Sequence, residues 1–435
     1  MLFHRADVRA AFLTALLSGL LWLAVMTPLA IPDEEYHYRA SWRLAHVLLA
    51  SLDASPEDEA LYFDFTGLRG HYNVRSGYAR LYEFLPAGPA GESARAEDVP
   101  VRAFPLLYLP QAVGLALARV LRLGFGGAFW MGRGANLLFY AACLAAAVAL
   151  APRYRSVLTA AGLLPMALHQ AASFSYDGAL NGLALFYTGA LLRAMTGQGR
   201  LGAREYWTLL VGAALLAPAK GGCLPLIALV GLIPAERFAS RDDRRRKLLG
   251  LAGACVLFLA LFLPAAAGRQ LGGGLNWEGR ANYTAAFALK HPVKTAGIFL
   301  RTLRTQGVFW LGCMAGWRLA GLTLALPGAL PASALTLLPL AGAGEGPTKK
   351  RRAAFLAAAG GMVFLAMCVM LFTWTSANRD TIQGVQGRYF LPAAPYLALA
   401  AAPPRRPRRL AAIVTAASML LNLTAAGCVL RYTLA

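Results

Sequence analysis

The chain has 435 residues, of which 58% are hydrophobic and 14% are charged, whereas soluble domains are about 25% charged. Apolar runs of about twenty residues recur from end to end, which excludes a soluble globular protein and predicts a polytopic membrane protein. The net charge of +21 resides mainly in short loops between apolar runs, so it indicates topology and contacts with membrane lipids and argues against nucleic acid as a partner. The six cysteines are scattered and show neither metal-ligand spacing nor a disulfide framework.

An acidic motif follows the first apolar run, Ala11 to Ile31. That run is too long for a signal-peptide core and lacks a clear cleavage site, so we expect a retained span. Pro32 suits the first position of a new helix. The first turn of that helix, where the helix dipole favours negative charge, would then hold Asp33, Glu34 and Glu35.

Two interpretations of this motif stand side by side. At helical spacing Asp33 shares a face with His37, and Glu35 shares another with Arg39. The plain interpretation is a capped helix start with solvated ion pairs. The functional one is a carboxylate base held at the membrane surface. Residues 32–103 hold much of the chain's acid, and we expect a membrane-surface helix followed by an irregular exoplasmic loop.

The rest of the chain predicts an all-α bundle of about 10 to 12 transmembrane helices in one integral membrane domain, residues 1–435. Further spans are expected over 104–121, 128–151, 157–173, 180–192, 248–267, 319–340, 353–374, 389–402 and 410–430. Trp207 to Pro234 is broken by Pro and Gly and predicts a helical hairpin with Lys220 at its tip. Residues 290–305 alternate basic and apolar side chains as a helix lying in the membrane interface does.

The basic loops indicate which side of the membrane each connecting segment faces. From Lys220 onward they follow the positive-inside rule consistently. In the first half, simple alternation from an outer Asp33 would put Asp177 inside and the basic loop 200–204 outside. Either one segment between Phe104 and Ser173 is re-entrant, or the weak loop charges mislead. Both alternatives stay open at this point.

Three ionisable residues in apolar surroundings are candidates for function, because such groups are costly in a membrane. Asp177 lies between two apolar runs, where a helix cap is the plain alternative. Lys220 lies between Pro218 and two glycines. Arg388 follows two glycines at the outer start of a span. Its fork matches phosphate oxygens, with snorkelling to the interface as the alternative.

Other chemistries lack their motifs. The chain has no phosphate-binding Gly-Lys-Ser/Thr loop and no His-Glu-x-x-His helix. No histidine spacing compels a metal site, and His37 is the best placed of them.

Several short motifs occur in order along the chain: Pro32-Asp33-Glu34 with His37, Pro105-Leu106-Leu107-Tyr108-Leu109-Pro110, Gly132-Arg133 with Asn136, Ser175-Tyr176-Asp177 with Asn181, Lys220, and Gly384-Val385-Gln386-Gly387-Arg388-Tyr389. In these the chain resembles a bacterial family of multi-span membrane proteins of unknown function, related to the GT-C glycosyltransferases. Members usually carry Pro-Ala after Asp-Glu, whereas this chain has Glu35-Tyr36.

The GT-C resemblance implies a polyprenyl-phosphate-linked sugar donor and an active site on the exoplasmic face of the bacterial plasma membrane. It also implies a catalytic carboxylate in the first exoplasmic loop, a position that Asp33 matches. The requirements of the reaction indicate the same residue. Glycosyl transfer needs a base to accept the proton of the acceptor hydroxyl and cations to stabilise the leaving phosphate.

The first hypothesis is therefore a glycosyltransferase that modifies a cell-envelope glycan or glycolipid. Asp33 would be the base, and Glu34 would orient the acceptor or bind a divalent cation with Asp33 and His37. Lys220 and Arg388 would grip the donor phosphate. The supporting residues would be His37, Arg39, Asp177, Gln386 and Tyr389. The rivals are a transporter or flippase of polyprenyl-linked glycans, and a non-catalytic membrane protein of envelope assembly. A transporter would be expected to show internal repeats, and none is convincing.

Overall fold

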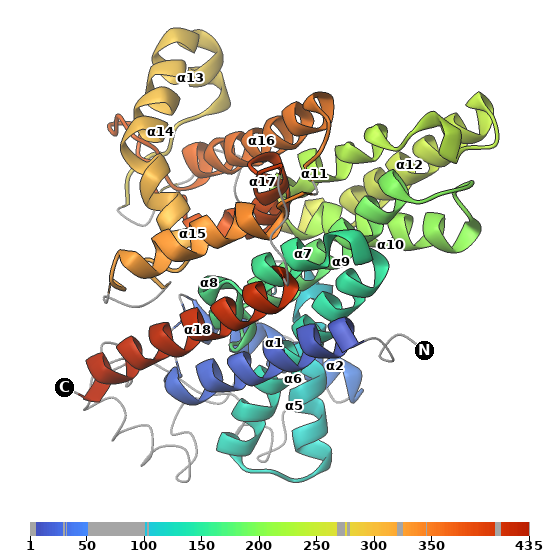
Figure 1. Ribbon diagram of the computed structural model, residues 1–435. Helices are drawn as coiled ribbons and strands as arrows, with labels where there is room; N and C mark the ends of the chain where they lie inside the picture. The colour runs from blue at the N-terminus through green and yellow to red at the C-terminus, as the bar shows by residue number, and fades with distance from the viewer. Residues whose placement is uncertain are drawn as a thin grey trace.

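The computed structural model describes residues 6–28, 31, 33–50, 101, 104–267, 275, 279–319, 325–344, 346–404 and 410–434. Within these ranges the regular elements are all helices, accompanied only by isolated β-bridges. The helices pack as an elongated bundle, with α5 and α6 at the bottom of Figure 1 and α13 and α14 at the top. The predicted class, an all-α polytopic membrane protein, is confirmed. Most of the predicted exoplasmic loop, residues 51–100, lies outside the described residues.

Four helices in the described part of the chain are long and apolar enough to cross a membrane. They are α1 (Ala6–Val25), α6 (Phe125–Leu150), α16 (Lys349–Thr373) and α18 (Leu410–Leu434). Each has 20 residues or more, which matches the thickness of the hydrocarbon core.

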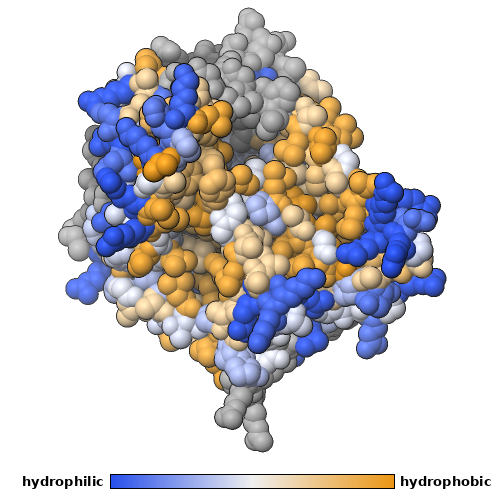
Figure 2. Space-filling model, turned by 90° about the horizontal axis from the view of Figure 1, so that it is seen from above, coloured by the Kyte–Doolittle hydropathy of each residue, from blue (hydrophilic) through white to orange (hydrophobic). Residues whose placement is uncertain are grey.

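The surface fits a lipid environment. Large apolar side chains are exposed along these helices, among them Leu17, Phe364, Val369 and Leu420. Figure 2 shows apolar surface over most of one face, with hydrophilic residues in separate clusters at its margins. Apolar surface this extensive would not stay soluble in water.

One predicted span is not a single continuous helix, because a proline interrupts it. Residues 157–173 form two short helices, α7 (Arg155–Gly162) and α8 (Pro165–Ala171). Leu164, before Pro165, has φ −57° and ψ 136°, as expected for a residue that proline excludes from the α region. Residues 389–402 comprise most of η9 (Gly387–Ala393) followed directly by α17 (Ala394–Ala400), and the described part of 319–340 includes most of α15 (Ala329–Ala341).

The predicted span 104–121 lies alongside α2 (Glu34–Leu48) instead of leading away from it. This segment forms η4 (Pro105–Tyr108) and α5 (Leu109–Val120). Tyr108 contacts His37 near the start of α2, and Arg119 contacts His46 near its end. α5 packs along α6, a candidate membrane span, as well as along α2.

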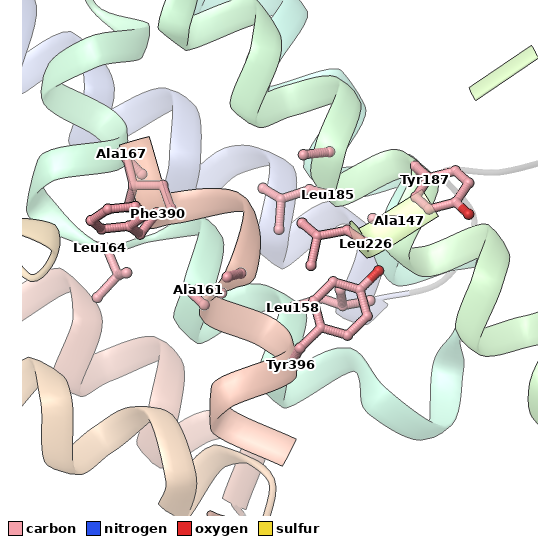
Figure 3. Packing of buried hydrophobic residues seen from close by; sticks show 14 of the residues in the cluster. Ala147, Leu158, Ala161, Leu164, Ala167, Leu185, Tyr187, Leu226, Phe390 and Tyr396 are labelled. Atoms are coloured by element: carbon pink, nitrogen blue, oxygen red, sulfur yellow. The ribbon is translucent and has the colours of Figure 1, made fainter. Parts of the chain in front are cut away.

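The core centres on α9 (Tyr176–Thr196), which packs along α6. A Cβ on Gly189 would lie 2.7 Å from Ala147 of α6, so the two backbones meet at a small residue, as membrane helices do. Figure 3 shows Tyr187 of α9 and Tyr396 of α17 among aliphatic side chains from α6 to α11. The Tyr187 hydroxyl donates to the Ile227 carbonyl at 3.0 Å, which satisfies a polar tip inside the core.

The predicted helical hairpin is confirmed. It consists of α10 (Ala203–Ala219), η6 (Gly221–Cys223), α11 (Leu224–Ala228), η7 (Leu229–Leu232) and η8 (Ala235–Arg237). The break falls at Lys220, whose backbone is extended at φ −157° and ψ 113°. At the open end, the Leu201 N–H donates to the Arg237 carbonyl at 2.6 Å, so the chain returns to where it began.

The C-terminal end of α9 gathers the basic loops. Glu205 pairs with Arg193 at 2.7 Å and with Arg237 at 2.5 Å. Arg351, at the start of α16, donates to the Met195 carbonyl at 3.0 Å. The basic loops 200–204, 236–247 and 349–352, among the described residues, thus share one end of the bundle, and Asp177 lies at the opposite end of α9.

Three helices complete the chain: α12 (Arg241–Ala267), α13 (Ala285–Lys290) and α14 (Pro292–Met314). The predicted interfacial segment 290–305 lies mostly within α14. It buries Ile298 and Thr302, while Val293 is 85% exposed and Leu300 is 68% exposed. Its place in a membrane interface stays a prediction.

These contacts predict which positions face each side of the membrane. In a chain with its native cysteines replaced by alanine, a cysteine at Gly221 or Asp380 should react with an impermeant maleimide added to intact cells. A cysteine at Arg246 or Lys350 should react only after permeabilisation, because the basic loops mark the cytoplasmic side. Labelling of position 221 only in permeabilised cells would place the hairpin tip on the wrong side.

Candidate polar site between the helices

The acidic motif forms the start of α2. Asp33 is the N-cap residue, is exposed, and has the left-handed backbone φ 61° and ψ 20°, a conformation that aspartate tolerates better than most residues. Its carbonyl accepts a hydrogen bond from the His37 N–H at 3.0 Å. The predicted face shared by Glu35 and Arg39 is confirmed by an ion pair of 3.2 Å.

Glu34 is buried, with 1% of its surface exposed. It accepts hydrogen bonds from Arg133 Nε at 2.9 Å and Nη2 at 2.6 Å, and from the Phe174 N–H at 3.1 Å. Arg133 also donates to the carbonyls of Met26 and Thr27. Both Glu34 oxygens are therefore engaged within the protein, and the pair ties the end of α1 to α2, α6 and the turn before α9.

That turn is held by two buried amides. Asn136 Nδ2 donates to the carbonyls of Ser173 at 2.8 Å and Ser175 at 3.1 Å. Gln111 Nε2 donates to the carbonyls of Phe174 and Ser175. Ser175 then caps α9 by accepting from the Asp177 N–H at 3.2 Å. The first turn of α9 is thus fixed from several helices, and with it the Asp177 side chain.

Asp177 brings the two predicted phosphate-binding cations together. Lys220 Nζ lies 3.1 Å from Asp177 Oδ1, and Arg388 Nε lies 3.3 Å from Asp177 Oδ2. The side chains of Asp177 and Arg388 are 5% and 6% exposed, and that of Lys220 is 20% exposed. One carboxylate facing two cations leaves an excess of positive charge. We call these three residues the ionic cluster.

Aromatic rings line the ionic cluster. Lys220 Nζ is 3.9 Å from the centre of the Tyr389 ring and 5.7 Å from that of Tyr176. Arg388 Cζ is 5.6 Å from the centre of the Tyr389 ring. Tyrosine faces attract cations most strongly when water is excluded. The rings therefore help to keep both positive charges in a buried position.

His37 connects the acidic motif to the ionic cluster. Its ring lies 5.1 Å from that of Tyr176, and its Nδ1 lies 2.9 Å from the Tyr108 hydroxyl. Burial lowers the pKa of His37 to about 3, opposed by the charge of Asp177, so the imidazole is neutral at pH 7 and acts as a hydrogen-bonding group.

Glycines let the Arg388 segment approach α14. A Cβ on Gly387 would lie 2.2 Å from the Trp310 carbonyl oxygen. Gly384 has φ +81°, a conformation that favours glycine. Gln386 precedes η9, and its carbonyl accepts the Tyr389 N–H at 3.0 Å. The backbone could not follow this path with side chains at these two positions.

An apolar groove of about 390 Å³ runs between α14, α16 and η9. Phe390, two residues after Arg388, belongs to its lining. The others include Leu303, Val308, Trp310, Val363 and Leu397. One residue of the groove lining thus follows Arg388 by two positions, and one wall of the groove is α16, a candidate membrane span.

Not every predicted site residue joins the ionic cluster. Arg39 pairs with Glu35, and Glu34 pairs with Arg133. Among the described residues, no three His, Cys, Asp or Glu side chains gather in the way a metal ion needs, so the divalent-cation alternative at Asp33, Glu34 and His37 gains no support.

Sequence reasoning missed Tyr108 and Tyr176 as parts of the site. The available signal for Tyr108 was its place in the Pro105–Pro110 motif. For Tyr176 the signal was its position next to Asp177. It also missed the pairing of Glu34 with Arg133, which the sequence separates widely.

The family model described as "Predicted membrane protein (DUF2142)" matches residues 16–397. The chain belongs to this family. The match covers the acidic motif and the whole ionic cluster. No curated protein and no solved structure matches the chain. The relation of the family to GT-C enzymes stays a prediction.

Glu34 and Glu35 are adjacent and allow a matched test of the buried ion pair. Glu34→Gln should lower the free energy of unfolding by about 3–5 kcal/mol, because it leaves the Arg133 charge buried and unpaired. Glu35→Gln should change it by less than about 1 kcal/mol, since its pair with Arg39 is partly exposed. Thermal unfolding in detergent micelles measures both, and equal shifts would contradict the structural role of Glu34.

Proposed function

We propose that the protein is a membrane glycosyltransferase that uses a polyprenyl-phosphate-linked sugar as its donor. The observation that carries the proposal is the meeting of Lys220 and Arg388 at Asp177, with an excess of positive charge in apolar surroundings. Buried cations need a reason, because their desolvation is costly. A phosphate that leaves with a growing negative charge is such a reason.

The apolar groove supports a lipid carrier for that phosphate. Its lining continues the segment that bears Arg388, so a hydrocarbon chain in the groove would bring an attached phosphate towards Arg388 and Lys220. A water-soluble nucleotide sugar would have no use for such a groove.

Asp33 supplies the base in this proposal. It is exposed at the start of α2, whereas Glu34 is engaged with Arg133 and keeps a positioning role. The acceptor hydroxyl oxygen attacks the anomeric carbon as the carbon–oxygen bond to the phosphate breaks. The bonding pair leaves with the polyprenyl phosphate, and the hydroxyl proton passes to Asp33.

The remaining predicted residues support these two roles. His37 and Tyr176 connect the base to the ionic cluster, and Tyr389 covers Lys220. Asp177 holds both cations in place before the donor arrives. The acceptor in this proposal is a cell-envelope glycan or glycolipid on the exoplasmic face of the bacterial plasma membrane.

The base is tested by Asp33→Asn. Turnover should fall by roughly 10²–10⁴, since a general base contributes about that much, while folding and membrane insertion stay intact. The measurement is release of polyprenyl phosphate by purified protein in detergent. Asp380→Asn, a change in an exposed carboxylate of another loop, should keep normal turnover. Near-normal turnover by Asp33→Asn would remove this residue from the mechanism.

The cations are tested by Lys220→Met and Arg388→Lys. Both should lower turnover at saturating donor and weaken donor binding less, because charge accumulates on the phosphate in the transition state. Arg388→Lys keeps the charge but loses the planar fork. Weakened binding with unchanged turnover would contradict phosphate stabilisation during the reaction. Transport of intact lipid-linked sugar across vesicles, without release of polyprenyl phosphate, would establish the flippase alternative.

A further inference from the structure

Arg388 of the ionic cluster and three other buried side chains carry polar atoms without a hydrogen-bond partner in the described structure. They are Arg388 Nη1, both amide atoms of Asn181, His169 Nε2 and Gln170 Oε1. The exposed fractions of these residues are 6%, 3%, 1% and 0%. Buried polar groups in native proteins are nearly always paired, so a group of unpaired ones indicates something that is bound there.

These four side chains come from α9 and from two elements that pack against it, α8 and η9. Asn181 follows Asp177 by one helical turn and so lies on the same face, on the inner side of the ionic cluster. His169 and Gln170 come from α8, which packs against both α9 and η9. A Cβ on Gly178 would lie 3.0 Å from the Gln170 carbonyl oxygen, so α8 and α9 meet closely here.

Arg388 belongs to the same group. The element that carries it, η9, packs against both α8 and α9, and His169 Nδ1 of α8 lies 3.3 Å from Gln170 Nε2. The three elements that carry the unpaired atoms thus pack against one another, and Asp177 of α9 contacts Arg388 of η9.

The donor or acceptor character of the unpaired atoms limits the chemical class of ligand that could bind them. Arg388 Nη1 and the Asn181 nitrogen donate, while the Asn181 and Gln170 oxygens accept. A phosphate or carboxylate would require donors only, and a metal ion would require acceptors only. Hydroxyl groups both donate and accept, so a mixed set of neutral groups suits a ligand with several hydroxyls.

We infer that Asn181, Gln170, His169 and Arg388 Nη1 form the subsite for the sugar ring of the donor. This inference rests on the proposed function, and it deepens that function by assigning a sugar-binding role to residues on α8 and α9. Arg388 then contacts both parts of the donor, with Nε beside the ionic cluster and Nη1 towards the sugar. Ordered water is the alternative occupant.

The test compares binding of polyprenyl phosphate with binding of polyprenyl-phosphate glucose and polyprenyl-phosphate mannose to the full chain in detergent. Wild-type protein should bind at least one glycosylated lipid about tenfold more tightly than polyprenyl phosphate, which corresponds to one or two hydrogen bonds. Asn181→Leu, a change of similar volume, should abolish this preference and leave the affinity for polyprenyl phosphate unchanged.

Stability distinguishes a sugar subsite from a water site. A buried amide without a hydrogen-bond partner does not stabilise the ligand-free protein. Asn181→Leu should therefore keep or raise the melting temperature. The control is Asn422→Leu, because the Asn422 amide is buried and fully engaged with Trp22, Leu163 and Ser418. That variant should melt at a lower temperature and keep the sugar preference.

Each other outcome overturns the inference. A sugar preference that survives Asn181→Leu would place the sugar elsewhere. A melting temperature lowered as much as in Asn422→Leu would mean that ordered water satisfies Asn181. Equal binding of all three lipids by wild-type protein would remove the subsite and leave the proposed function standing. Binding of none of them would overturn the proposed function as well.

Discussion

The buried ion pair between Glu34 and Arg133 is the interaction on which the site depends. Through it and the Phe174 N–H, the end of α1, the start of α2, the interior of α6 and the turn before α9 are joined at one point. A buried pair is stable only when its remaining hydrogen-bonding atoms are also satisfied, and Arg133 meets this requirement through two backbone carbonyls. The same ion pair positions Asp33 and Asp177, because Asp33 caps α2 and Asp177 lies in the first turn of α9.

The second constraint is the charge balance at Asp177. Two cations and one carboxylate share a space closed by tyrosine rings, and none of the three could be buried there alone at an acceptable free energy. The carboxylate keeps Lys220 and Arg388 in place without fully neutralising them. An anion that enters this space therefore finds cations already positioned, which is the arrangement that electrostatic catalysis requires.

The sequence predicted those features that depend on local pattern. Helical class, the break at Lys220 and the pair between Glu35 and Arg39 all follow from periodicity, proline and spacing. Periodicity could not show that α5 lies along α2, because a 12-residue apolar helix looks the same whether it crosses or not. Nor could spacing show that Glu34 meets Arg133, since only tertiary packing brings α2 against α6. The motif was read as two catalytic carboxylates, yet burial separates them into an exposed residue and an engaged one.

The two sides of the site are held by separate supports. Glu34 and Arg133 fix the side that carries Asp33 and Asp177, while α14 holds the side that carries Arg388. Thr302 Oγ1 of α14 accepts the Ile382 N–H at 2.9 Å, and Gly387 packs against the Trp310 carbonyl. Asp177 links the two supports through its contacts with Lys220 and Arg388. Because a packed interface shifts between discrete arrangements and does not deform continuously, a ligand that replaced Asp177 at Arg388 would weaken the link between these supports.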